Sequence, residues 1–217
     1  MFIAIDGIDG AGKTTLGKRL AEMLGANDVV LTKEPTDNSK WGQRLRKAAV
    51  EGRLPPDQEL EYFRQDRQHH ICNTISPALE KGKIVISDRY VDSTLAFQAQ
   101  NPNEANKLFE NLVGEILVPD VTFILLCPVE IGLDRVRKRD NDNLTQFEKV
   151  DVLNRAEKIY ASRKGENYAL IDASISVEET LGQAINVLKI KFSSNEIIKR
   201  AISRCDDVFA NEARAIY

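Results

Sequence analysis

The sequence predicts an α/β fold in which a mainly parallel sheet of five strands is flanked by helices. Two observations carry this prediction: short apolar runs rich in β-branched residues recur along the chain, and longer stretches of helical periodicity separate them. Apolar runs of this kind are typical of strands whose two faces are both covered. The predicted strands span 2–5, 28–32, 83–87, 121–126 and 168–172.

The first helix is predicted directly after the first strand, where Leu16, Leu20 and Met23 fall on one helical face. A long amphipathic stretch covers 57–82, and Pro77 predicts a kink or break within it because proline cannot donate a helical hydrogen bond. Further helices are predicted at roughly 104–117, 129–139, 147–163 and 177–191, and polar loops at 34–43 and 139–146.

We expect one domain over residues 1–192, because a chain of 217 residues with 42% hydrophobic residues can bury a substantial core. Residues 193–217 are predicted to form an amphipathic helical extension after the last strand–helix unit. No apolar run approaches the roughly 20 residues that cross a bilayer, and the chain enters a strand at once. We therefore expect neither contact with a membrane nor a signal peptide.

Charge and cysteine usage narrow the classes of partner and compartment. The formal net charge of -3 gives no electrostatic reason to expect a nucleic-acid polymer as a partner. Cys72, Cys127 and Cys205 are widely spaced and odd in number. This usage favours reduced thiols over a disulfide framework or a metal cluster, and it predicts a cytoplasmic protein.

The strongest local signal is the segment 7–14, which fits the pattern G-x-x-x-x-G-K-[ST] between a predicted strand and a predicted helix. Its glycines allow successive backbone N–H groups to turn toward an anion, and the helix adds its N-terminal dipole. Lys13 is expected to reach the β- and γ-phosphates of a nucleotide, and Thr14 to ligate Mg²⁺. The residues expected to bind the nucleotide, which is ATP in the resemblance described below, are Gly7, Ile8, Asp9, Gly10, Ala11, Gly12, Lys13, Thr14 and Thr15. The motif predicts nucleotide binding and leaves the reaction open.

A second signal lies at the end of the third predicted strand. Asp88 falls at the carboxyl edge of the sheet, where ligands of α/β folds collect, and could hold the hydration shell of Mg²⁺ opposite Thr14. Arg89 follows and could bind an anionic group with both arms of its guanidinium. The alternative for this pair is a structural Asp–Arg ion pair.

A third signal lies on the long predicted helix, where Phe63 and Arg67 are four residues apart and share a face. An aromatic plane beside a guanidinium can stack on a base and donate a hydrogen bond to its edge. The alternative is an ordinary core residue next to a surface residue.

Taken in this order, the motifs resemble those of the thymidylate kinases, a family of P-loop nucleoside-monophosphate kinases. The resemblance covers most of residues 1–172 and includes "KEP" at 33–35 and "STLAFQ" at 93–98. The basic segment 132–140 is similar to the beginning of the lid of that family, and we place the lid at about 135–148. The fold implied is a P-loop NTPase-type sheet with a small lid segment.

The resemblance implies an ATP-dependent enzyme that phosphorylates dTMP to dTDP with Mg²⁺ and works as a homodimer. Asp9 would face the acceptor nucleotide, Phe63 would stack on thymine and Arg67 would bind its O4 edge. The residues implied to bind the substrate are Asp9, Lys33, Pro35, Phe63, Arg67, Arg89, Thr94, Phe97 and Gln98. Those implied to act in catalysis are Lys13, Asp9, Arg89 and the lid residue Arg139, and the metal ligands are Thr14 and Asp88.

The chain departs from the family pattern at several positions. Asp6 stands where the family usually has Glu, Lys33 where it has Arg, and Phe97 where it often has a Tyr beneath the deoxyribose. In members with Gly at the position of Gly10, a lid arginine normally supplies positive charge to the transition state, but Gln146 lies close to where that arginine aligns. The remaining candidates for this role are Arg135, Arg137 and Arg139.

Two alternatives follow from these departures. The acceptor could be another deoxynucleoside monophosphate, such as dUMP or a 5-substituted relative, or the chain could bind nucleotides without catalysis. A switch GTPase is disfavoured because the sequence lacks a guanine-reading N-K-x-D segment.

Overall fold

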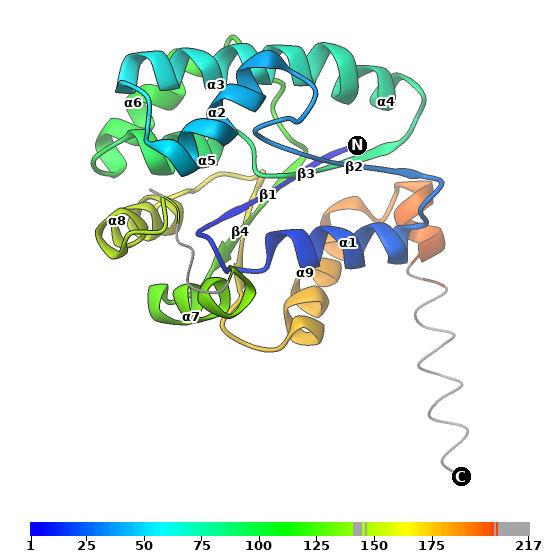
Figure 1. Ribbon diagram of the computed structural model, residues 1–217. Coiled ribbons are helices and arrows are strands. Elements are labelled where there is room, and N and C mark those ends of the chain that lie inside the picture. Colours follow the sequence, from blue (N-terminus) through cyan, green and yellow to red (C-terminus); the bar gives the residue numbers. More distant parts are fainter. Residues whose placement is uncertain (141–144, 146, 202, 204–217) are drawn as a thin grey trace.

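The computed structural model describes residues 1–140, 145, 147–201 and 203. In these residues, five parallel strands form one sheet in the order β2-β3-β1-β4-β5 (Figure 1). The predicted α/β fold is confirmed, and each predicted strand is present with its ends shifted by at most two residues. The strands are β1 (Phe2–Gly7), β2 (Val29–Lys33), β3 (Ile84–Asp88), β4 (Val121–Leu126) and β5 (Tyr168–Asp172).

Helices cover both faces of the sheet, which explains why its central strands consist almost entirely of buried residues. One face is covered by α1 (Lys13–Leu24) and α9 (Val177–Phe192), which also pack on each other. The other face is covered by α4 (Ser76–Glu80), α5 (Val91–Gln98) and α8 (Val150–Ala161). The remaining helices pack on these layers or on each other: α2 (Lys40–Glu51), α3 (Pro56–His70), α6 (Pro102–Leu112) and α7 (Val129–Asp140).

The long helical stretch is interrupted where Pro77 predicts a break. Helix α3 ends at His70, a wider π-helical turn η1 (Ile71–Ile75) follows, and α4 begins at Ser76. Proline lacks an N–H and crowds the preceding helical turn, and a π-turn directly before it relieves both conflicts.

The predicted loop at 34–43 is wrong from Lys40 onward, because α2 begins there with Ser39 as its N-cap. The Ser39 side chain accepts a hydrogen bond of 2.8 Å from the Gly42 backbone N–H. Helix α5 was also not predicted, since seven of its eight residues are buried and it has no polar face to reveal its period.

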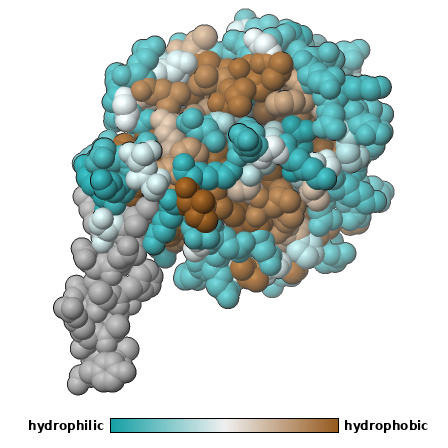
Figure 2. All heavy atoms as spheres, turned by 180° about the vertical axis from the view of Figure 1, so that it is seen from behind, coloured by the Kyte–Doolittle hydropathy of each residue, from teal (hydrophilic) through white to brown (hydrophobic). Residues whose placement is uncertain are grey.

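Parts of the predicted lid, of the cysteine set and of the C-terminal extension lie outside the described residues. These parts are 141–144 and Gln146 in the lid at about 135–148, Cys205, and most of the extension at 193–217, of which residues 196–201 are helical. The division of the chain at residue 192 stays a prediction. In the part of the chain that the structure describes, no helix combines the length and apolar character needed to cross a bilayer. Figure 2 shows hydrophobic residues gathered in patches on one face of the molecule, between hydrophilic ones.

Candidate active site

The phosphate-binding loop connects β1 to α1 at the carboxyl edge of the sheet. Gly10 and Gly12 have φ angles of +78° and +91°, in the left-handed region that favours glycine. The Lys13 side chain is buried and its Nζ donates a 2.7 Å hydrogen bond to the carbonyl of Ile8. The lysine therefore lies inside the concave face of the loop, where an anion would meet both its charge and the backbone N–H groups.

Gly10 is also required by packing. A Cβ at this position would lie 2.0 Å from the carbonyl oxygen of Gly132, in the first turn of α7, and a Cβ at Gly132 would lie 2.7 Å from the carbonyl oxygen of Asp9. Two glycines thus allow α7 to begin directly against the loop. No side chain fits at position 10, so any cation near the phosphates beyond Lys13 has to come from outside the loop.

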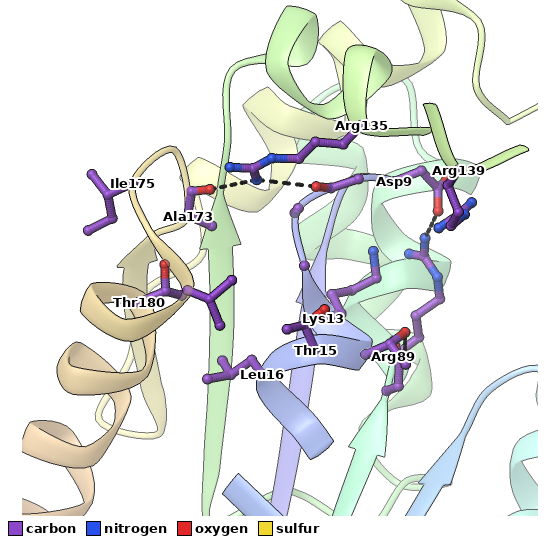
Figure 3. Close-up of a pocket in the computed structure, with 16 residues that line it drawn as sticks. Asp9, Lys13, Thr15, Leu16, Arg89, Arg135, Arg139, Ala173, Ile175 and Thr180 are labelled. Carbon is purple, nitrogen blue, oxygen red and sulfur yellow. Dashed lines mark hydrogen bonds and ion pairs between the residues drawn. The ribbon is translucent and has the colours of Figure 1, made fainter. Parts of the chain in front are cut away.

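A cavity of about 530 Å³ opens beside this loop, and we call it the loop cavity. Its polar end is formed by the loop, and its far side by residues after β5 and at the start of α9. Arg135 bridges these sides, because its Nη1 donates to the carbonyl of Ala173 at 2.8 Å and to that of Gly10 at 3.3 Å (Figure 3). The loop cavity is lined by Asp9, Gly10, Ala11, Gly12, Lys13, Thr14, Thr15, Leu16, Asp88, Arg89, Arg135, Arg139, Ala173, Ile175, Val177 and Thr180.

Thr14 and Asp88 meet at the edge of the loop cavity. The Thr14 hydroxyl donates a hydrogen bond to a carboxylate oxygen of Asp88, the last residue of β3. Hydroxyl and carboxylate oxygens are the ligands that Mg²⁺ prefers, so this pair fits the ion implied by the motif. Among the described residues, no cluster of three or more His, Cys, Asp or Glu side chains could hold a metal. A metal at Thr14 and Asp88 would take its other ligands from phosphate and water.

Arg89 is aimed across the carboxyl edge of the sheet by an uncommon backbone conformation, with φ at +73°. Its Nη2 forms an ion pair with the Asp9 carboxylate, and its Nη1 donates to the carbonyl of Gly7 at 3.1 Å and to the Ser93 hydroxyl at 3.0 Å. Figure 3 shows Arg139 beside this ion pair.

A second cavity, of about 300 Å³, lies on the other side of that ion pair, between α2, α3 and α5, and we call it the helix cavity. Asp9 and Arg89 line both cavities, so a ligand in one would meet a ligand in the other at these two side chains. The helix cavity is lined by Asp9, Glu34, Pro35, Leu45, Arg46, Ala49, Val50, Phe63, Arg67, Arg89, Tyr90, Ser93, Thr94, Phe97, Thr145, Phe147 and Glu148.

Phe63 and Arg67 both line the helix cavity, as the spacing on one helical face predicts. The fully buried Arg67 donates through Nη2 to Glu34 and to the Thr94 hydroxyl, each at 2.8 Å. Its Nη1 is buried and has no hydrogen-bond partner among the described residues. A buried donor without a partner is costly, so this nitrogen is suited to a polar ligand atom in the cavity.

Burial and neighbouring charges shift the pKa values of Asp9 and Arg89, which form the shared ion pair, and that of Lys13 beside them. Burial and the neighbouring Arg89 guanidinium lower the pKa of Lys13 to about 8, against the opposing effect of Asp9. Burial alone would raise the pKa of Asp9, but Arg89 and Lys13 lower it below its ordinary value. Burial alone would lower the pKa of Arg89, but the acidic groups around it, Asp9 foremost, raise it. The loop cavity thus keeps a carboxylate and a guanidinium charged next to a lysine held by its carbonyl contact.

Most residues that the sequence predicted for the site line one of the two cavities. Pro35, Thr94 and Phe97 lie in the helix cavity, and Arg139 lies in the loop cavity, where it also contacts Glu148 at 3.9 Å. Lys33 and Gln98 line neither cavity. Lys33 forms an ion pair with Asp37 at 2.8 Å, and Gln98 donates to Glu59 at 2.5 Å.

The structure adds residues that the sequence analysis missed. Arg46 reaches the helix cavity from α2, which was not predicted, and donates to the carbonyl of Pro35. Phe147 meets Phe97 edge to face, with ring centroids 5.4 Å apart, and the Arg53 guanidinium lies 4.5 Å from its ring. Phe147 could have been noticed in the sequence, because it is an aromatic residue directly after the polar stretch that follows α7.

A known family matches this chain across both cavities. Residues 5–184 match the sequence profile of the family described as thymidylate kinase. The chain belongs to the thymidylate kinase family. The match begins in β1 and ends in α9, so it includes every residue that lines either cavity, and the resemblance seen in the motifs is confirmed.

Individual family members are similar over most of their length. The thymidylate kinase of Xanthomonas oryzae pv. oryzae is 43% identical over 186 residues, and that of Xanthomonas campestris pv. campestris is 42% identical over 189 residues. Each of these matches covers 85% of this chain and 81% of the relative. A probable thymidylate kinase of Archaeoglobus fulgidus is 38% identical over 201 residues, which cover 90% of this chain and 100% of the relative.

Proposed function

We propose that this chain is an ATP-dependent nucleoside-monophosphate kinase that transfers the γ-phosphoryl group of ATP to dTMP, giving ADP and dTDP. The observation that carries the proposal is the wall of Asp9 and Arg89 that the two cavities share. Phosphoryl transfer requires the terminal phosphorus of a donor and the oxygen of an acceptor to meet in line, and two cavities that open onto one ion pair suit that geometry.

The loop cavity suits the donor. The loop N–H groups and Lys13 would hold the β- and γ-phosphates, and the space between Arg135 and Ile175 would receive the base. Thr14 and Asp88 would hold Mg²⁺. When bound, that ion supplies positive charge to the donor's terminal phosphates.

The helix cavity suits the acceptor. Phe63 would stack on thymine, and the unpartnered Nη1 of Arg67 would donate to its O4 atom. Thr94 and Pro35 would line the base, and Phe97 would lie beneath the deoxyribose. Arg89 would bind the acceptor phosphate. It would then give up part of its hydrogen bonding to Asp9, because the phosphate carries more negative charge than a carboxylate. Lys33 and Gln98 are engaged with Asp37 and Glu59, and we leave them out of the proposed acceptor site.

The chemical step needs alignment and charge more than proton transfer. The acceptor phosphate is already a nucleophile at neutral pH, so no general base is required. Lys13 and Arg89 would offset the charge of the transferring group from two sides, and Arg139 at the end of α7 would add a third cation. Asp9 would keep Arg89 oriented until the acceptor arrives.

A coupled ATP assay with a panel of nucleoside monophosphates tests the proposal. We expect the highest kcat/KM with dTMP and lower values with dUMP, with dCMP and with the ribonucleotide counterpart of dTMP. A higher value with dUMP would favour the alternative acceptor, which no relative named above supports. Binding of ATP and dTMP without release of ADP would instead indicate a non-catalytic relative.

Two further properties follow from the same proposal. The family resemblance and the apolar patches in Figure 2 support a homodimer, which light scattering of the purified protein would test. Use of ATP and dTMP by an enzyme with unpaired Cys72 and Cys127 fits a cytoplasmic location.

A further inference from the structure

The fully buried carboxylate of Asp6 lies behind the active site and has no contact with either cavity. Asp6 precedes the phosphate loop in β1, and both of its oxygens point toward the segment that begins with Arg89. The Tyr90 backbone N–H donates to them at 3.2 and 3.3 Å, and the Ser93 hydroxyl donates to one of them at 2.5 Å. A buried carboxylate needs such donors, but their identity ties it to the acceptor arginine.

The first tie runs through the backbone. The φ angle of Arg89 is +73°, a backbone conformation that residues other than glycine keep when the surrounding structure holds it. The Arg89 N–H donates to the carbonyl of Ile5 at 2.9 Å, and the next N–H, that of Tyr90, donates to Asp6. Consecutive residues of β1 thus hold the backbone on both sides of the Arg89 Cα.

The second tie runs through the Ser93 hydroxyl. A hydroxyl has one proton to donate and two lone pairs that accept. Ser93 contacts Asp6 at 2.5 Å, Arg89 Nη1 at 3.0 Å and the Tyr160 hydroxyl at 3.0 Å. Since ionised Asp6 can only accept and Arg89 can only donate, the Ser93 proton goes to Asp6, and Tyr160 must donate to Ser93. The carboxylate therefore leaves a lone pair of Ser93 available for the guanidinium.

From these two ties we propose that Asp6 is a positioning residue for Arg89, which holds the acceptor arginine in place through the Tyr90 N–H and through the proton order at Ser93. The proposal rests on the proposed function, in which Arg89 binds the acceptor phosphate. It assigns a purpose to the position where this chain has Asp and the family usually has Glu.

The test uses Asp6→Asn, which keeps the size of the side chain but removes the charge and replaces one acceptor oxygen by an NH₂ donor. The Tyr90 N–H and the Ser93 hydroxyl then no longer have two separate oxygens that accept from them. We expect the KM for dTMP to rise about 10-fold and kcat to fall by a similar factor, the scale of one lost hydrogen bond to a charged group. The KM for ATP should stay within about twofold, because Asp6 makes no contact with the donor side. Asp6→Glu, which restores the carboxylate, should recover most of the loss. Burial raises the pKa of Asp6 to about 7, so the assays belong at pH 8, where the wild-type carboxylate is ionised.

Ser93→Ala gives a second route to the same result if Asp6→Asn fails to fold. It removes the hydroxyl and should raise the KM for dTMP in the same direction. The matched control is Tyr168→Phe, which removes a half-buried hydroxyl that contacts Arg163 and Asp92 and does not contact Arg89. Wild-type kinetics are expected for this control.

The proposal is overturned if Asp6→Asn or Ser93→Ala has wild-type kinetics. It is also overturned if Asp6→Asn and Asp6→Glu lose activity equally and on both substrates, since packing would then explain the effect. Failure of the proposed function is distinguishable, because it appears as absent dTMP phosphorylation in the wild type. Calorimetric titration of the same variants with dTMP alone measures the acceptor site without any turnover.

Discussion

The two cavities that share Asp9 and Arg89 are built in different ways. The phosphate end of the loop cavity consists of one continuous segment, residues 9–16, and offers backbone N–H groups and a lysine. The helix cavity collects side chains from α2, α3 and α5 and from Thr145, Phe147 and Glu148, and no single contiguous motif contains them. A phosphate has the same shape in every nucleotide, whereas a base and a sugar must be distinguished from others. The difference suggests that backbone geometry provides the phosphate site and that tertiary packing provides the specificity.

The largest expected effect isolates the loop cavity. Lys13→Ala should reduce kcat about 1,000-fold, because the lysine stabilises charge that develops on the transferring group, while the KM for dTMP changes little. The measurement is steady-state turnover with ATP and dTMP varied separately. Lys18→Ala, on the exposed side of α1, serves as the control. Retention of a tenth or more of the wild-type kcat in Lys13→Ala would contradict this role.

The next effect isolates the helix cavity. Phe63→Ala should raise the KM for dTMP about 10-fold and leave the KM for ATP unchanged, since stacking of a base on an aromatic side chain contributes about 1–3 kcal/mol. Tyr62→Ala removes the neighbouring aromatic residue, which lines neither cavity, and should have little effect on either constant. Equal changes in both KM values for Phe63→Ala would show that the two cavities are not separate in the way the structure indicates.

A smaller effect is expected at the outer wall of the helix cavity. Phe147→Ala removes the edge-to-face contact with Phe97 and the contact with the Arg53 guanidinium, each worth about 1 kcal/mol. We expect the KM for dTMP to rise about threefold, with a larger rise for dTMP than for dUMP if the ring also contacts the thymine methyl group. Val150→Ala, at an exposed position nearby in the sequence, is the comparison.

The smallest effect concerns stability and not turnover. Burial and the neighbouring charge of Asp92 raise the pKa of Asp6 to about 7, so the folded state holds a proton that the unfolded state has already lost. Between about pH 4 and pH 7 the folded state therefore binds more protons than the unfolded state, and this group makes the free energy of unfolding fall as pH rises. Asp6→Asn lacks this titration. Thermal melts at pH 5 and pH 8 should show a smaller loss of Tm for Asp6→Asn than for the wild type, and an equal or larger loss would contradict the assignment.

The sequence predicted the parts of the fold and site that depend on local patterns. The five strands, the break at Pro77 and the loop around Lys13 follow from apolar runs, proline geometry and one contiguous motif. Helix α5 could not be predicted from periodicity because nearly all of its residues are buried. Helix α2 did carry a local signal, because Gly42, Leu45 and Ala48 recur with helical spacing after the N-cap residue Ser39, but the polar residues around Asn38 favoured a loop.

The candidate site also divides into contacts that a local sequence pattern predicts and contacts that arise from the tertiary fold. Phe63 and Arg67 could be paired from their spacing, because both lie on one helix. The shared wall of Asp9 and Arg89 joins residues 80 positions apart, and only the parallel pairing of β1 with β3 brings them together. Gln98 illustrates the converse: its position in a motif suggested contact with the base, but its amide donates to Glu59, a buried carboxylate on α3 that also pairs with Arg53.

The close approach of Gly10 and Gly132 constrains how this enzyme can evolve. A member of the family could gain a cation near the phosphates by changing the third residue of its loop after the first glycine, but here the backbone of α7 already occupies that space. No single replacement removes a main-chain carbonyl, so an arginine at position 10 becomes acceptable only after a separate change shifts the start of α7. The two steps are epistatic, because an arginine at position 10 without the shift of α7 would clash with the Gly132 carbonyl. A lineage with this contact thereby draws any catalytic cation beyond Lys13 from α7 and not from position 10 of the loop.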